Sequence, residues 1–463
     1  MLLKPDPTFY PSARSAMDAP AETAAYVATL SPLGGQQPDA LATVDVDPAS
    51  STYGQITDLL EMPNSGDELH HHGWNACSAA LCPYAPHPHL ERRYLVVPGL
   101  RSSRIYIVDT KGDRGTEIVK IIEPQVVTER TGYTRPHTIH CGPDGIYVSC
   151  LGDADGDAPG GVFVMDHQTF EPLGRWEVDR GSQRLHYDFW WHLGHDVMVT
   201  SEWGTPAMIE DGLNPELLLG RQYGHQLHVW DLRTRRHVEA LDLGDQYQMA
   251  LELRPSHDPT NTYGFVNAVV SVEDLSSSIW LWHRDGGQWA VRKVIDIPAE
   301  PADPDDLPPA LKDFGAVPPL VSDHVLSLDD RHLAVSCWGT GELKLFDVSD
   351  PFQPVETGSV RIGGIVDRAR HPAADRPLSG GPQMVECSRD GRRLYFTNSL
   401  YAAWDDQFYT DGIDGWMVKA DVADDGSLSL DPEFFVDFTP TGRRAHQIRL
   451  SGGDASSDSY CYP

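Results

Sequence analysis

The fold is most readily deduced from one segment, Arg331-His-Leu-Ala-Val-Ser336, which is followed by Glu342-Leu-Lys-Leu-Phe-Asp-Val-Ser-Asp350 and Val355-Glu-Thr-Gly358. Short, largely apolar runs that are separated by acidic or polar turns are typical of antiparallel strands joined by hairpins. The turn Leu328-Asp-Asp-Arg331 precedes the first run, and one more strand is expected before that turn. The segment therefore predicts a four-stranded antiparallel unit.

The same hairpin recurs along the chain. Seven hairpins of one type indicate a repeat fold, and four strands per repeat match the blade of a β-propeller. We therefore predict an all-β protein, a seven-bladed β-propeller with long loops inserted between its strands. Two stacked β-sandwich domains are the alternative, and the uniform spacing of the hairpins disfavours them. The hairpins span residues 40–60, 104–122, 161–176, 226–241, 278–295, 342–358 and 416–438.

The N-terminal segment does not share this pattern. Residues 1–38 are rich in Pro, Ala and Ser, and we predict an irregular arm with a weak helical patch near residues 21–30. Residues 39–463 are assigned to a single propeller domain. A strand near Leu41–Val46 is expected to close the ring by pairing with the last blade.

Net charge and cysteine content limit which binding partners and which cellular compartment are expected for the protein. The formal net charge of −32 repels nucleic acids and anionic membrane surfaces, so neither is expected as a main partner. The seven cysteines are odd in number and form no C-x-x-C pair, which favours a reducing compartment over a disulfide framework. No secretory leader and no apolar run long enough for a membrane helix is found. We predict a soluble cytoplasmic protein; the sequence leaves its oligomeric state open.

A histidine triplet is the most conspicuous chemical feature. It lies in Asp67-Glu-Leu-His-His-His-Gly-Trp-Asn-Ala-Cys77, where His70, His71 and His72 are consecutive. Imidazole is a common ligand of copper, zinc, iron and nickel. A polar loop with surface histidines is the alternative interpretation. Further histidines that converge on the triplet would favour a metal site.

The inner strands of the blades can be aligned on the turns that follow them. This alignment places His137, Gln383, His446 and Ser322 at equivalent positions of four blades. Since side chains alternate between the two faces of a strand, His137 and His446 should face the same way, and His140 should point oppositely in a regular strand. Three blades thus supply histidines to one end of the central channel.

Two inner strands offer carboxylates at the channel. The alignment places Asp188 at the channel position of its blade and His195 in a turn, and Glu252 is an inward carboxylate of the following blade. Three or four neutral imidazoles without a thiolate suit copper, zinc or iron, and the spacing does not choose among them. The chain has no H-E-x-x-H motif and no paired-cysteine zinc motif.

Many short motifs of the chain resemble those of one family, the selenium-binding protein and methanethiol oxidase family. The resemblance covers roughly residues 40–458. The motifs are Asp67-Glu-Leu-His-His71, Gly73-Trp-Asn-x-Cys77, Ser102-Ser-Arg-Ile-Tyr106, His137-Thr-x-His-Cys141, Tyr187-Asp-Phe-Trp190, Ser201-Glu-Trp203, Gly220-x-x-Tyr-Gly224, Leu326-Ser-Leu-Asp-Asp-Arg331, Gly380-Gly-Pro-Gln-Met384, Ser399-Leu-Tyr-x-Ala-Trp-Asp405, Ala445-His446, Gly452-Gly-Asp454 and Ser456-Ser-Asp458.

The resemblance implies a β-propeller that oxidises methanethiol, a small volatile thiol, with O2 and water to formaldehyde, hydrogen sulfide and hydrogen peroxide. It also implies copper as the cofactor. The family's expected ligand positions fall here on His70, His71, His137 or His140, and His446. For proton transfer in such a reaction, the sequence offers Glu252 or His140.

One departure from the family bears on selenium. Some members carry a cysteine implicated in selenium binding where this chain has Gly54, so selenium binding through that position is not expected. Two other functions compete with the oxidase. The first is a non-catalytic propeller that binds selenium, a metal or a protein. The second is a metal-dependent hydrolase or lactonase, which the all-histidine cluster disfavours.

Overall fold

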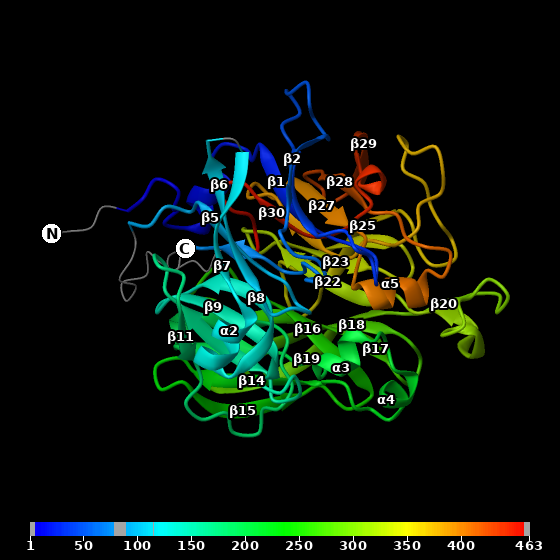
Figure 1. Ribbon diagram of the computed structural model, residues 1–463. Coiled ribbons are helices and arrows are strands. Elements are labelled where there is room, and N and C mark those ends of the chain that lie inside the picture. The colour runs from blue at the N-terminus through cyan, green and yellow to red at the C-terminus, as the bar shows by residue number, and fades with distance from the viewer. Residues whose placement is uncertain (1–4, 78–88, 114, 458–463) are drawn as a thin grey trace.

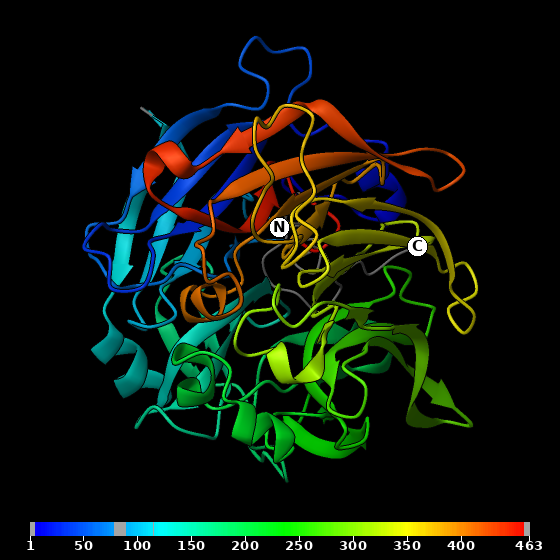
Figure 2. The same cartoon turned by 90° about the vertical axis from the view of Figure 1, so that its right-hand side faces the viewer.

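The computed structural model describes residues 5–77, 89–113 and 115–457 (Figure 1). Its strands form seven four-stranded antiparallel sheets, the blades, and Figure 2 shows them arranged in a ring. The prediction of a seven-bladed all-β propeller is therefore confirmed.

In each blade the strand named first below lies nearest the axis, and each of these inner strands contacts that of at least one neighbouring blade. From the inside outward, the blades are β30 (Arg444–Leu450), β1 (Ala24–Leu30), β2 (Ala40–Asp45) and β3 (Ile56–Glu61); β4 (Gly73–Trp74), β5 (Tyr94–Pro98), β6 (Ile105–Gly112) and β7 (Gly115–Ile122); β8 (Tyr133–Cys141), β9 (Ile146–Asp153), β10 (Gly161–Met165) and β11 (Pro172–Arg175); β12 (Phe189–His192), β13 (Val197–Thr200), β14 (Gln226–Asp231) and β15 (Arg236–Asp242); β16 (Tyr247–Pro255), β17 (Tyr263–Ser271), β18 (Ser277–Asp285) and β19 (Gln288–Ile297); β22 (Val321–Leu326), β23 (His332–Cys337), β24 (Glu342–Asp347) and β25 (Val355–Arg361); and β26 (Val385–Cys387), β27 (Arg393–Thr397), β28 (Trp416–Val422) and β29 (Leu428–Asp437).

The ring closes differently from the prediction. The C-terminal strand β30 is the inner strand of the first blade and pairs with β1, where Val27 lies opposite Ile448. The segment expected to close the ring, β2, instead pairs with β1 and β3. The helical patch near residues 21–30 was also wrong, because residues 24–30 form β1 and belong to the propeller rather than to an arm. A strand buried on both faces reads as a continuous apolar run, which does not distinguish strand from helix.

Aspartates stabilise the hairpin turns on which the prediction was based. An aspartate at the end of the third strand accepts hydrogen bonds from backbone N–H groups two or three residues further on, which is the geometry of an Asx turn. Five blades share this arrangement, at Asp45, Asp109, Asp166, Asp231 and Asp347.

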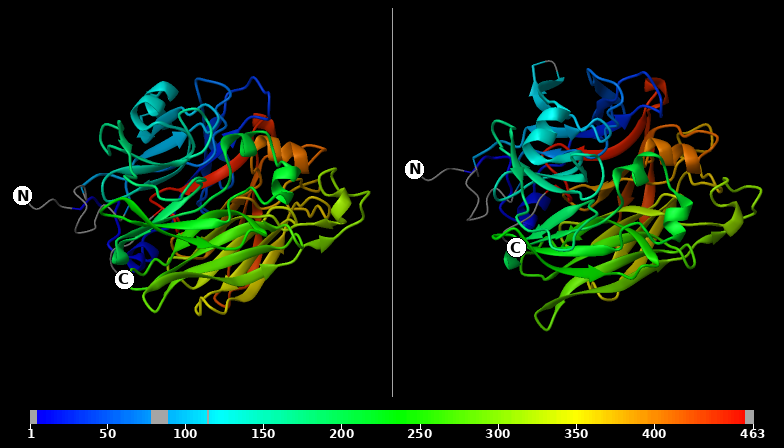
Figure 3. Two further views of the ribbon diagram at one scale, coloured as in Figure 1. Left: turned by 90° about the horizontal axis from the view of Figure 1, so that it is seen from below. Right: turned by 60° about the horizontal axis from the view of Figure 1, so that its bottom comes forward.

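Insertions between the second and third strands of two blades supply most of the helices. The helices are α1 (Ala13–Met17), α2 (Pro124–Thr131), α3 (Pro206–Glu210), α4 (Pro215–Leu219) and α5 (Ala402–Phe408), and a small separate sheet pairs β20 (Glu300–Pro301) with β21 (Ala316–Val317). The insertions that carry α3, α4, α5 and β20 lie on one side of the propeller, on the right in Figure 1 and toward the viewer in Figure 2, and Figure 3 agrees. We call these insertions the cap.

Two sequence-based expectations concern the whole chain. Within the described residues, no helix combines the length and apolar character needed to cross a membrane. The cysteines in the same residues are free and buried, namely Cys77, Cys141, Cys150, Cys337 and Cys387. Cys82 and Cys461 lie outside the residues that the structure describes.

Candidate metal centre

The histidine triplet runs into β4 and is held from both neighbouring blades. The Gln447 side chain accepts a hydrogen bond from the backbone N–H of His72, and Arg449 donates one to its carbonyl oxygen. At the start of β4, Gly73 lies directly on β8, where a Cβ atom would come within 2.4 Å of the carbonyl oxygen of Ile139. Only glycine allows this approach, which brings the triplet beside β8.

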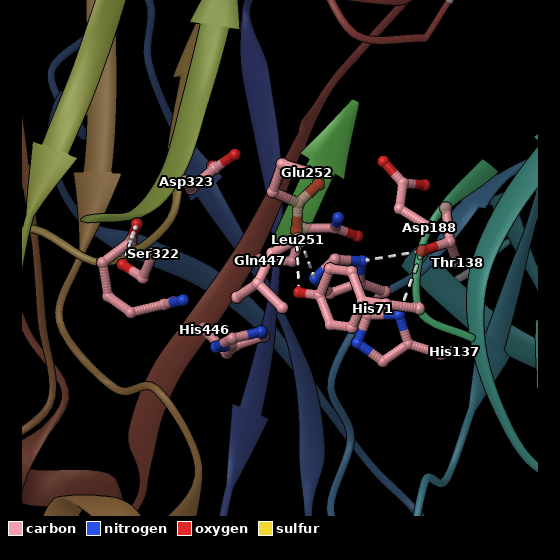
Figure 4. A network of polar contacts seen from close by, with 12 residues as sticks. His71, His137, Thr138, Asp188, Leu251, Glu252, Ser322, Asp323, His446 and Gln447 are labelled. Atoms are coloured by element: carbon pink, nitrogen blue, oxygen red, sulfur yellow. Dashed lines mark hydrogen bonds and ion pairs between the residues drawn. The ribbon is translucent and has the colours of Figure 1, made fainter. Parts of the chain in front are cut away.

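The structure brings four of the predicted histidines together. The ring centroids of His70 and His446 are 3.7 Å apart, and those of His71 and His137 are 4.0 Å apart. The ligand atoms of His70, His71 and His137 all lie within 4.8 Å of one another. In Figure 4, His71 and His137 lie close together and His446 lies to one side of them. We call these four residues the histidine cluster.

Local bulges in the inner strands aim these side chains. In β8, β16 and β30, two residues lie opposite one residue of the adjacent strand: His137 and Thr138, Leu251 and Glu252, and His446 and Gln447. Side chains of the adjacent strands bind the freed backbone groups: Ser149 accepts from the N–H of Thr138, and Asn267 from that of Glu252. A bulge re-aims a side chain that regular alternation would send elsewhere, and such bulges often lie next to active sites.

The four imidazoles are neutral and keep nitrogen lone pairs free. Burial lowers the pKa of each, that of His446 to about 3. The His446 Nδ1 lies 2.6 Å from the carbonyl oxygen of Ser399, which can only accept, so Nδ1 carries the proton and Nε2 carries the lone pair. Within the described residues, the Nε2 atoms of all four histidines have no hydrogen-bond partner. Buried polar atoms are rarely left so, and this donor set fits a metal ion that prefers imidazole.

Glu252, which the sequence offered as an inward carboxylate, lies at the edge of the histidine cluster. Its Oε1 atom is 3.6 Å from Nε2 of His71 and accepts a hydrogen bond of 2.8 Å from the hydroxyl of Tyr187 (Figure 4). Its Oε2 atom accepts one of 3.1 Å from Arg254. Sequence analysis gave Tyr187 no role, although its ring also contacts His137, with centroids 4.4 Å apart. The position of Tyr187 directly before the inward-facing Asp188 was the available signal.

Arg254 forms ion pairs with Glu252 and with two further buried carboxylates. Arg254 lies 3.0 Å from Asp323 and 3.6 Å from Asp188. Burial, and then the charge of Glu252, raise the pKa of Asp188 to about 8 and that of Asp323 to about 7. Asp188 and Asp323 are therefore partly protonated near neutral pH, so the region around Arg254 can hold a proton close to the histidine cluster.

The other histidines named from the sequence lie elsewhere. The ring of His140 packs edge-on against Trp190, with centroids 3.7 Å apart, and its pKa is lowered by burial and by Arg449 and Arg254. The structure thus assigns the position facing the cluster to His137 rather than His140. His72 follows the cluster in sequence, but His70 and His71 are the members of the triplet that pack against His137 and His446. His195 lies in a turn, as expected.

Aromatic side chains cover the histidine cluster on the side of the cap. The rings of His70 and Tyr401 meet edge-on at 5.7 Å, and Tyr401 directly precedes α5. Glu68 accepts a hydrogen bond from the backbone N–H of Ala402 and pairs with Arg101, which ties the triplet segment to the cap. The histidine cluster is therefore shielded from bulk water.

Comparison with known proteins agrees with the motifs. The family described as 56kDa selenium binding protein (SBP56) matches residues 3–461. The chain belongs to this selenium-binding protein family. A solved structure from Sulfolobus tokodaii, described as a hypothetical selenium-binding protein, is 57% identical, with a TM-score of 0.96 over 99% of this chain and 100% of that one.

Family members with curated names extend to animals and plants. The human methanethiol oxidase is 40% identical, and the match covers 97% of this chain and 97% of that protein. The Xenopus laevis methanethiol oxidase is 39% identical with the same coverage, and selenium-binding protein 3 of Arabidopsis thaliana is 39% identical over 96% of this chain and 94% of that protein. A Pseudomonas aeruginosa periplasmic gluconolactonase, 12% identical with a TM-score of 0.56 over 92% of this chain and 99% of that one, shares the fold alone.

Proposed function

We propose that this selenium-binding protein family member is a copper-dependent methanethiol oxidase. The reaction would convert methanethiol, O2 and water to formaldehyde, hydrogen sulfide and hydrogen peroxide. The observation that carries the proposal is the set of four buried, neutral imidazoles whose Nε2 atoms have no hydrogen-bond partner among the described residues. Full-length relatives named methanethiol oxidase support the substrate.

Copper suits these donors and this reaction. Imidazole nitrogens bind copper, zinc and iron, but zinc has no redox chemistry and cannot accept electrons from a thiol. A bound copper ion would supply electron transfer and would polarise the thiol sulfur. His71, His137 and His446, together with His70, would hold it through their Nε2 atoms or, for His70, either ring nitrogen.

The residues around the cluster have distinct tasks in this proposal. Glu252 accepts the thiol proton at Oε1, since this carboxylate is already close to His71. Tyr187 fixes the orientation of that carboxylate through its hydroxyl, and Arg254 fixes the other oxygen. The aromatic walls exclude water, which strengthens electrostatic interactions within the site. His140 is not needed as a proton carrier, because its ring is packed against Trp190.

Other aspects of the cellular role are proposals of the same kind. The net charge of −32 favours small neutral substrates and O2 over nucleic acid or membrane partners. The free, buried thiols suit the cytoplasm. The competing function is a propeller that binds selenium or a metal without turnover. The printed name of the Arabidopsis relative favours it, but no thiol stands at Gly54.

Elemental analysis of the untagged protein, paired with a peroxide assay on methanethiol, tests the proposal. We expect about one copper per chain and equal yields of peroxide, formaldehyde and sulfide, as the balanced reaction requires. A protein reconstituted with zinc is the control and should form none of the three products. Selenium or metal bound without any product after copper loading would establish the binding function instead.

The pH dependence of metal binding is a second expected result. Protons compete with a metal only where the folded histidines can be protonated, and their pKa values lie well below 6.5, that of His446 near 3. Copper affinity should therefore change less than about twofold between pH 7.5 and pH 5.5 and fall only as the pH approaches the folded pKa values. A hexahistidine peptide, with ordinary pKa values, should lose about tenfold per ligand over that range. A similar loss in the protein would show that the cluster is hydrated.

A further inference from the structure

The cap contains a small apolar pocket separate from the histidine cluster. It lies between α4, the insertion between β20 and β21, the N-terminal part of β16, and α5, and its volume is about 40 Å³. Every side chain that lines it is apolar. A single water needs roughly 10–15 Å³ on a comparable measure and at least two polar partners, so this pocket has room for a few atoms but offers water no partners.

The pocket has an apolar rim at the surface. Leu219 and Phe314 line it, and these residues are 56% and 43% exposed. Exposed hydrophobic side chains are unremarkable singly, but here two of them border the same cavity. Trp404 contributes an indole nitrogen to the lining, and this nitrogen already donates to the carbonyl oxygen of Ile209. The rim and walls therefore favour uncharged apolar molecules.

The inner wall of the pocket connects to the histidine cluster through aromatic rings. Trp404 packs on Trp203 with centroids 5.6 Å apart, Trp203 on Tyr187 at 5.3 Å, and Tyr187 on His137 at 4.4 Å. Along β16, Met249 lines the pocket, and Leu251 lies beside Glu252 in Figure 4. Met249, Leu251, Tyr187, Trp203 and Trp404 all belong to one continuous apolar cluster.

We propose that this pocket binds small, uncharged, apolar reactants and passes them to the histidine cluster. The inference rests on the proposed function for the identity of the reactants, methanethiol and O2. Both have only two heavy atoms and both are neutral, since a simple thiol with a pKa above 8 is protonated near pH 7. Each fits a pocket of this size, whereas a charged metabolite would lose its hydration without gaining a polar partner.

The pocket gives the buried site a route that excludes water. The cluster is enclosed by the inner strands, Tyr401 and the cap, so a reactant must cross packed side chains. An apolar path lets a small neutral molecule do so at low cost, while water and ions gain nothing there. The passage involves rotation of side chains such as Met249 and Trp203 at the inner end of the pocket.

Binding is tested first, independently of activity. Crystals of the holoprotein are pressurised with xenon and, separately, exposed to methanethiol. We expect density for each in the pocket of the wild-type protein. In Ala310→Phe, which fills the pocket with an added ring, that density should be absent. Val272→Phe fills it from another wall, and Ala423→Phe, at an exposed turn between β28 and β29, is the matched control. An empty wild-type pocket overturns the proposal.

Kinetics then test whether the route serves the site. At equal copper content, either pocket-filling variant should raise the KM for methanethiol, for O2, or for both by about tenfold, with kcat unchanged. The reactant whose KM rises is the one that reaches the site through the pocket. Unchanged KM values for both reactants, with the pocket filled, would overturn the route. If the wild-type protein bears no oxidase activity, the proposed function fails, yet xenon and methanethiol binding still decide whether the pocket is a site.

Discussion

The His137→Ala variant is expected to retain less than about a tenth of the wild-type copper and to lose methanethiol oxidation by at least about a thousandfold. The Nε2 atom of His137 points into the cluster without a partner, while its Nδ1 atom is 2.9 Å from the hydroxyl of Thr138. Removing this imidazole takes away one metal ligand. It also removes the ring against which His70 and His71 pack. Inductively coupled plasma analysis and the peroxide assay measure the two effects.

A matched control separates loss of a ligand from loss of a buried ring. His324 lies on the inner strand β22, is fully buried, and has a pKa lowered by burial and by Arg254. The His324→Ala variant should therefore lose a similar amount of folding stability but keep its copper. Copper retained in full by an inactive His137→Ala protein would remove His137 from the ligand set. The same comparison with His446→Ala extends the test to β30.

The repeat pattern was sufficient to predict the blades but not the closure of the ring. Five of the hairpins share a local signature, an apolar run that ends in an aspartate, because their turns have an Asx geometry that only a few residue types supply. The closing pair β1 and β30 has no such turn, since it joins opposite ends of the chain. Its strands are buried on nearly all sides, so neither shows the alternation that marks a half-exposed strand.

The sequence was sufficient to predict which types of residue form the candidate site, but not how all of them are arranged. The alignment of inner strands correctly paired His137 with His446, because both positions are fixed by the same distance to the following turn. The choice between His137 and His140 could not be made by counting, since the extra residue in the β8 bulge breaks the alternation. Tyr187 has no motif of its own. Its role depends on the distance from its hydroxyl to Glu252, which only the assembled ring defines.

The Glu252→Gln variant is expected to keep its copper and to lose kcat by about a hundredfold or more, with a much smaller change in KM. Glutamine preserves the size of the side chain and can still accept the Tyr187 hydrogen bond, but it cannot take up a proton. The carboxylate is buried and lies between His71, Tyr187 and Arg254, so solvent cannot readily replace it. Stopped-flow kinetics across a pH series, together with copper content, provide the measurement.

Asp323→Asn is the matched control for this proton role. Asp323 pairs with the same Arg254, but none of its hydrogen bonds or ion pairs joins it to the histidine cluster. Since the pKa of Asp323 is raised to about 7, the folded protein already accommodates its neutral form. Asparagine keeps one oxygen that accepts from the backbone, and thermal unfolding of the variant measures whether the NH2 group that replaces the other oxygen is tolerated. If Glu252→Gln instead loses copper, then Glu252 is a ligand. If both variants lower kcat equally, the proton is held by the whole group around Arg254 rather than by Glu252. A selective effect of Glu252→Gln, with copper retained, would identify Glu252 as the group that accepts the proton from the thiol.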